Sequence, residues 1–104
     1  MNEKLLSLLG LARRARRLSC GFEAVSGAIK TKRARLVLVA AGLSPKTVKE
    51  IRYLCEKHGV PARAPGFTMQ ELSHAVGFKS GVAALDDAGF AQKALTLCNN
   101  DGEE

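Results

Sequence analysis

The chain has 104 residues, of which 46% are hydrophobic, and its mean hydropathy of −0.03 is typical of a single globular domain with one modest core. Its longest apolar stretch, residues 36–41, is far shorter than the roughly 20 residues of a membrane-spanning helix, and its first residues lack a signal-peptide pattern, so we expect a cytoplasmic protein without membrane contact. The net charge of +6 is uneven, because residues 1–35 alone carry +7, which indicates either a surface that faces a polyanion or a set of merely solvated side chains.

The first predicted helix covers residues 3–17. Apolar side chains recur along it at spacings of three and four, as on the buried face of a helix: Leu5, Leu8, Leu9, Ala12 and Ala15. Its last turn would hold four arginines, which the helix dipole favours there: Arg13, Arg14, Arg16 and Arg17. A short strand over residues 18–20 follows, and Gly21 then opens a second helix over residues 22–31.

Residues 36–41 form a predicted strand at the centre of the sheet. The run favours β structure and does not alternate between polar and apolar residues, as expected for a strand that is covered on both faces. Ser44 and Pro45 then supply an N-cap and a first helical position, and the helix that they start should end at Gly59. A short strand over residues 62–64 follows.

A capping box predicts the next helix, over residues 69–76. Thr68 and Glu71 have the spacing at which each side chain bonds the backbone of the other, and Gly77 is suited to end the helix. Residues 82–85 indicate another buried strand, and Asp86 or Asp87 can cap a last helix over residues 88–98. Residues 99–104 are predicted to be a flexible acidic tail.

The order of these elements predicts the α/β fold class. Strands that alternate with helices imply crossover connections and helices on both faces of a sheet. We therefore expect a three-layer α/β/α sandwich with a small, mostly parallel (mixed) central sheet of about four strands. Residues 1–98 would form its single domain.

No catalytic residue, metal site or cofactor site is predicted. The turn at Gly42 lacks the further glycines and the lysine of a phosphate-binding loop. Cys55 and His58 are better explained as a core residue and a residue at a helix end than as a nucleophile and its base. The three cysteines are expected to be reduced and buried, since one of them must stay unpaired in any disulfide scheme. We therefore expect no enzyme and no small-molecule substrate.

Motifs spread over the chain in one register carry a resemblance to a known family. They are LGLA at residues 9–12, LSCG at 18–21, ARLVLVA at 34–40, CEKHGVP at 55–61, ELSHAVG at 71–77 and DDAGFA at 86–91. Together they resemble the ribosomal protein L7Ae/L30e superfamily, and within it the small bacterial YlxQ-like proteins. The resemblance covers about residues 5–95 and implies an α/β/α sandwich without catalytic activity, in a family of which many members bind kink-turn RNA.

The resemblance also implies where RNA would bind. Relatives grip RNA with a Gly-x-Asn-Glu-x-x-Lys stretch at the start of the second helix and with an apolar loop before the last strand. Here Gly21 matches the first stretch, whereas Glu23, Ala24 and Gly27 stand in place of the asparagine, the glutamate and the lysine. A carboxylate offers no donor, alanine cannot reach a base and glycine removes a cation, so usual kink-turn recognition should be weakened.

The full set of predicted RNA-binding residues combines these motif positions with the nearby cations: Arg16, Arg17, Gly21, Phe22, Glu23, Ser26, Lys30, Lys32, Arg33, Arg35, Phe78, Lys79 and Ser80. The implied fold would bring Lys32, Arg33 and Arg35 close to Gly21, where a phosphate could approach the start of the helix. We expect a monomer whose partner is structured RNA, with ribosomal RNA as one candidate. The alternative is a protein-interaction module that kept the sandwich and lost specific RNA recognition.

Overall fold

The computed structural model describes residues 2–102, with side chains through Cys98, and alternates helices and strands along the whole chain. Its elements are α1 Glu3–Arg14, β1 Leu18–Cys20, α2 Phe22–Lys30, β2 Leu36–Val39, α3 Pro45–His58, β3 Ala62–Arg63, α4 Met69–Val76, β4 Val82–Leu85 and α5 Ala88–Gly102. The last helix is therefore longer than predicted. The flexibility of residues 99–104 stays a prediction, because their side chains, and residues 103 and 104 altogether, lie outside the described part.

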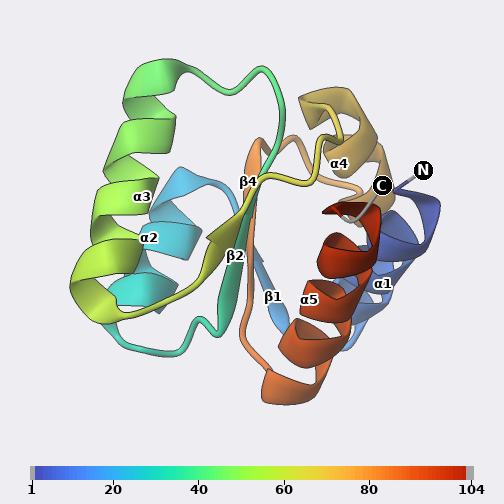
Figure 1. Ribbon diagram of the computed structural model, residues 1–104, viewed down its shortest axis with the longest axis horizontal. Coiled ribbons are helices and arrows are strands. Elements are labelled where there is room, and N and C mark those ends of the chain that lie inside the picture. The colour runs from blue at the N-terminus through green and yellow to red at the C-terminus, as the bar shows by residue number, and fades with distance from the viewer. Residues whose placement is uncertain (1, 103–104) are drawn as a thin grey trace.

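The elements form the predicted three-layer sandwich. Helices α2 and α3 cover one face of the four-stranded sheet, and α1, α4 and α5 cover the other (Figure 1). Alternate side chains of β2 enter the two layers: Leu36 and Leu38 pack with α1, α4 and α5, whereas Val37 and Val39 pack with α2 and α3. The strand is buried along its entire length, as its unbroken apolar run predicts. None of the helices within residues 2–102 is both long and apolar enough to cross a membrane.

The sheet is mixed, but the prediction that it is mostly parallel is wrong. Its strand order is β1-β4-β2-β3, and β4 runs antiparallel to both of its neighbours. Only β2 and β3, joined by the crossover helix α3, are parallel.

The path of the chain around α4 explains the direction of β4. After β3 the chain continues in the direction of β2, and Thr68 pairs with Ala41 beyond the end of that strand. The eight residues of α4 stay at this end of the sheet, and β4 begins there, with Val82 opposite Val39. A strand that begins where its neighbour ends must run back antiparallel to it, because no element has returned the chain to the other end.

The predicted helix starts are confirmed by their hydrogen bonds. The Ser44 hydroxyl accepts from the Thr47 amide at 3.2 Å, and the two bonds of the capping box between Thr68 and Glu71 are 2.8 and 3.0 Å long. Of the two aspartates before α5, Asp87 is the cap, because its carboxylate accepts from the Phe90 amide at 3.0 Å. Asp86 does not cap α5, and its carboxylate can make other contacts.

Helix α1 ends earlier than predicted, at Arg14 instead of residue 17. Arg16 adopts a left-handed conformation (φ 61°), and the Arg17 carbonyl accepts from the amide of Asp86 at 2.9 Å, next to the β1–β4 ladder. The chain must therefore leave the helix before Arg17 in order to join the sheet. A left-handed conformation costs a residue other than glycine about 1–2 kcal/mol, which the pairing with β4 offsets.

Candidate functional site

Two segments that are distant in sequence meet at one end of the sheet, at the start of α2. Gly21 precedes α2 with φ 90°, and its amide donates to the Val82 carbonyl and to the Ser80 hydroxyl, both at 3.1 Å. A side-chain carbon added at Gly21 would lie 3.7 Å from the Phe78 ring. The loop before β4 therefore packs beside the start of α2, as the resemblance implies.

Ser80 anchors this loop from below the surface. It is buried, and its hydroxyl donates to the Val82 carbonyl at 2.6 Å while accepting from Gly21. Its amide donates to the Ser73 hydroxyl at 3.0 Å. Phe78 and Lys79, by contrast, are exposed. Of the three predicted loop residues, these two offer side chains to a ligand, and Ser80 fixes the loop that carries them.

Arg13 also lies beside Phe78, although it was not among the RNA-binding residues predicted from the sequence. Its guanidinium carbon lies 5.5 Å from the centre of the Phe78 ring, close enough for a cation–π interaction. Burial raises the pKa of the Cys20 thiol, and a hydrogen bond with Arg13 opposes this rise. Arg13 thus joins the edge strand β1 to the exposed loop. Four arginines close together in sequence gave no signal to single out this one.

A second cluster of basic side chains lies along the same edge of the molecule. Arg16, Arg17 and Arg33 line a hollow of about 420 Å³, together with Arg13, Leu18, Ser19 and Asp86. The Asp86 carboxylate accepts from the Ser19 hydroxyl at 2.8 Å and lies 3.7 Å from Nε of Arg33. This is the one ion pair among the residues whose side chains are described. Asp86 therefore holds Arg33 beside the arginines that follow α1.

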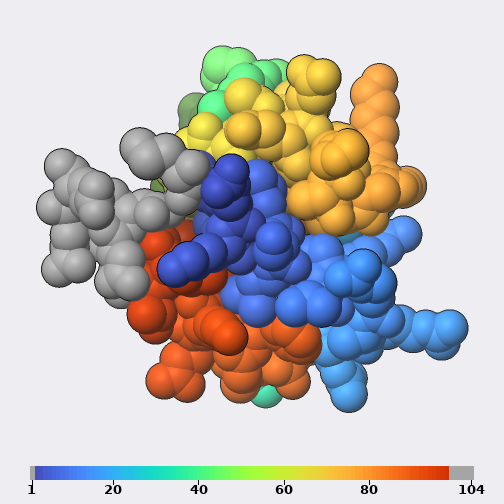
Figure 2. Space-filling model, turned by 90° about the vertical axis from the view of Figure 1, so that its right-hand side faces the viewer, coloured from blue at the N-terminus to red at the C-terminus, as the bar shows by residue number. Residues whose placement is uncertain are grey.

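We call the residues from Phe78 to this hollow the β1-edge surface, and define it as Phe78, Gly21, Arg13, Arg16, Arg17 and Arg33. In Figure 2 the light blue side chains of the segment around β1 project from the same side of the molecule as the orange loop before β4. The surface combines one exposed aromatic ring with four guanidinium groups. Stacking on bases and binding of phosphates are the contacts that such groups make with nucleic acids.

The predicted closeness of Lys32, Arg33 and Arg35 to Gly21 is wrong. The Gly21 amide bonds Val82 at the start of β4, whereas the Arg35 amide bonds the Leu85 carbonyl at the end of β4 (2.7 Å). The nine residues of α2 separate the two groups by about 13 Å. These cations follow the far end of α2, because the chain must return to that end to start β2.

The remaining predicted residues lie on α2 and face a different surface. Phe22, Glu23, Ser26 and Lys30 line a groove between α2 and α3. Phe22, Glu23 and Lys30 are exposed, but Ser26 is 93% buried. No side chain caps α2, so the amides of its first turn have no partner within the helix.

The described side chains contain no group of three or more histidines, cysteines, aspartates or glutamates that could hold a metal. Cys55 is 3% exposed, and burial raises the pKa of its thiol to about 11. This supports the interpretation of Cys55 as a core residue and not a nucleophile, because a thiol that is protonated at neutral pH is a poor nucleophile.

We expect Cys55 to resist alkylation in the folded protein. Because its pKa is raised, only about one thiol in a thousand is ionised at pH 8, and the reaction with iodoacetamide accelerates only as the pH rises toward 11. Peptide mass spectrometry after a timed reaction at pH 8 measures this, with the denatured protein as control. Modification of Cys55 at the same rate in both samples would contradict the prediction.

The chain is similar to known proteins over most of its length. A model described as the ribosomal protein L7Ae/L30e/S12e/Gadd45 family matches residues 3–95. The RNA-binding protein YlxQ of Bacillus subtilis (strain 168) is 35% identical over 91 residues, which cover 86% of this chain and 90% of the relative. The RNA-binding protein YlxQ of Enterococcus faecium is 32% identical over 95 residues, which cover 91% of each chain.

Solved structures agree with the fold. A protein of unknown function from Bacillus halodurans C has a TM-score of 0.86 and 35% identity, with 92% of this chain and 97% of that chain covered. A 15.5kD RNA binding protein of Giardia lamblia has a TM-score of 0.80, with 98% and 88% covered. At 19% identity the second likeness concerns the fold alone.

Proposed function

The chain belongs to the ribosomal protein L7Ae/L30e/S12e/Gadd45 family, and on this basis we propose that it is a non-enzymatic protein that binds structured RNA. The observation that carries the proposal is the exposed Phe78 ring, which lies close to both Gly21 and the guanidinium of Arg13. In this place a base can stack on the ring while the nearby arginines neutralise phosphates.

The two ends of the β1-edge surface would make different contacts with RNA. At the loop end, Phe78 supplies apolar contact, and the first-turn amides of α2, which no side chain caps, suit a phosphate. At the other end, Arg16, Arg17 and Arg33 supply charge without reading sequence. Lys30, Lys32 and Arg35 extend the positive field beyond this end, and Lys79 extends it beside Phe78.

Shape and backbone contacts should dominate the recognition. The family motif is interrupted at Glu23, Ala24 and Gly27, so a standard kink-turn loses the contacts that these positions make in relatives. We therefore propose a monomer that binds structured RNA in the cytoplasm, with ribosomal RNA as the first candidate. Kinship with ribosomal proteins supports this choice.

Removal of Arg13 should weaken RNA binding about tenfold more than removal of Arg35. Arg13→Ala and Arg35→Ala each delete one positive charge, but only Arg13 contacts the Phe78 ring. Fluorescence anisotropy with one labelled ribosomal RNA fragment at a fixed salt concentration compares the two variants. Equal losses would mean that the affinity comes from a diffuse positive field and not from the β1-edge surface.

Two controls make this comparison specific. Thermal unfolding of both variants tests for damage to the fold, because Arg13 also bonds the Cys20 side chain. Arg13→Lys keeps the charge and removes the planar guanidinium, so it should recover part of the lost affinity if stacking on Phe78 contributes.

A further inference from the structure

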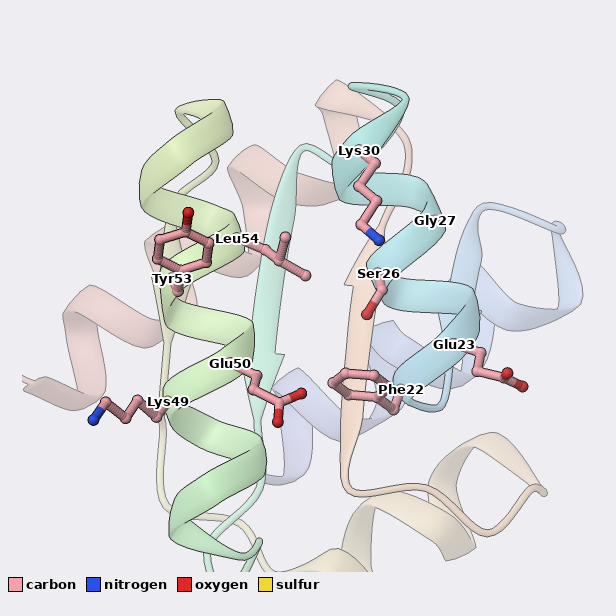
Figure 3. A pocket seen from close by; sticks show the side chains of 9 residues that line it. All are labelled: Phe22, Glu23, Ser26, Gly27, Lys30, Lys49, Glu50, Tyr53 and Leu54. Carbon is pink, nitrogen blue, oxygen red and sulfur yellow. The ribbon is translucent and has the colours of Figure 1, made fainter.

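A groove between α2 and α3 lies outside the β1-edge surface. It has a volume of about 780 Å³, and its lining is mostly apolar. Nine residues line it, as Figure 3 shows: Phe22, Glu23, Ser26, Gly27, Lys30, Lys49, Glu50, Tyr53 and Leu54. The volume is within the roughly 300–1,000 Å³ of ligand-binding pockets.

The side chains that point into the groove form an apolar site with a few polar groups. In Figure 3 Phe22 and Leu54 face the space from opposite helices, while Lys49 and Glu23 point away from it. Gly27 adds no side chain, and a carbon placed there would meet nothing within 4 Å. Phe22 and Tyr53 are exposed aromatic rings, at 39% and 60%. The groove thus offers flat apolar contact, and no side chain at Gly27 narrows it.

Ser26 supplies the polar feature that needs an explanation. Its side chain is 93% buried, and its hydroxyl has no hydrogen-bond partner among the described residues. A buried hydroxyl without a partner costs free energy that a ligand with a suitable donor or acceptor would recover. Lys30 and Glu50 also face this space from the two helices. They add one strong donor and one strong acceptor.

We propose that the α2–α3 groove binds one unpaired nucleobase of the RNA held on the β1-edge surface, an inference that rests on the proposed function. Phe22 follows Gly21 directly, so the groove begins where that surface ends. A strand that passes the start of α2 can turn one base into the groove. There the base stacks on Phe22, and its edge meets Ser26, Lys30 and Glu50.

The composition of the groove favours a base over the other occupants. A phosphate would find balanced charge, because one lysine and one glutamate, Lys30 and Glu50, face the space. A leucine-rich helix of a protein partner would leave the buried Ser26 hydroxyl without a partner, because its backbone groups are bonded within the helix. A nucleobase is flat, largely uncharged, and carries both donors and acceptors on its edge.

Tyr53 gives a reporter of this groove alone, since it is the single tyrosine of the chain. Protein grown with 3-fluorotyrosine carries one fluorine label, at position 53. We expect its ¹⁹F resonance to shift on addition of an RNA hairpin with one bulged adenosine, and to stay in place with the same hairpin in which that nucleotide is abasic. In fluorescence anisotropy the abasic hairpin should bind about tenfold more weakly.

Filling the groove should abolish this preference. Gly27→Leu adds a side chain at a residue that lines the groove. An added carbon there meets no atom within 4 Å, so we expect the variant to fold and to bind the two hairpins equally. The matched control, Gln92→Leu, adds the same side chain to an exposed position of α5 across the sheet and should retain the preference.

The outcomes separate this inference from the proposed function. If neither hairpin binds, RNA binding itself fails and the groove proposal falls with it. If both bind equally and the fluorine resonance does not move, only the groove proposal is overturned. A resonance that shifts with protein concentration in the absence of RNA would assign the groove to a second copy of the chain, and would likewise overturn it.

Discussion

The affinity for RNA should fall about a thousandfold when the salt concentration rises from about 50 to about 200 mM, if about six phosphates are neutralised. Nine lysines and arginines lie in residues 1–35 against two glutamates, and Arg13, Arg16, Arg17 and Arg33 gather around one hollow. Each cation that binds a phosphate releases a condensed counterion, so the logarithm of the affinity falls linearly with that of the salt concentration.

Anisotropy titrations of one labelled RNA at four or five salt concentrations measure this slope. Arg13→Ala should make the slope shallower by about one, because one phosphate contact is lost. An affinity that does not change with salt would contradict a surface built from arginines. Absence of RNA binding at low salt would instead favour the alternative function, a protein-interaction module on the same fold.

The sequence predicted the elements well where local chemistry determines them. Helix starts at Ser44 and Thr68 follow from side chains that bond the backbone three residues away, and the buried strand β2 follows from an unbroken apolar run. The direction of β4 depends on something else. It depends on α4 staying at one end of the sheet. The length of a helix does not reveal at which end of the sheet the next strand begins.

The candidate site was only partly predicted, because some of its contacts also depend on how distant elements pack. Gly21 and Phe78 were identified by resemblance, and the structure brings them together. Arg13 was missed because its contact with Phe78 joins two elements that only the packing of α1 against the edge strand brings close. Asp86 and Asp87 were equal as caps in the sequence. Asp86 faces Ser19 and Arg33 only because the chain just after β4 pairs with the chain just before β1.

Restoring the family motif should convert the protein into a tighter kink-turn binder. The variant Glu23→Asn, Ala24→Glu, Gly27→Lys regains two base-directed side chains and one cation, and we expect about 1–3 kcal/mol of kink-turn affinity for each base-directed contact. All three positions are exposed, and a Cβ added at Gly27 meets no atom within 4 Å. Replacing a mid-helix glycine also favours the helix by about 0.5–1 kcal/mol, so the variant should fold.

Binding of a labelled kink-turn hairpin, compared with a straight duplex of the same length, measures the gain. The substitutions raise the net charge by one, so Glu23→Gln, which makes the same change in charge, is the matched control for electrostatics alone. The control should improve binding to both RNAs slightly, whereas the triple variant should improve binding to the kink-turn selectively, because the restored motif is the one with which relatives grip kink-turn RNA. Tight and selective kink-turn binding by the unmodified protein would show that the interrupted motif is not a loss, and that this chain reads the kink with other residues.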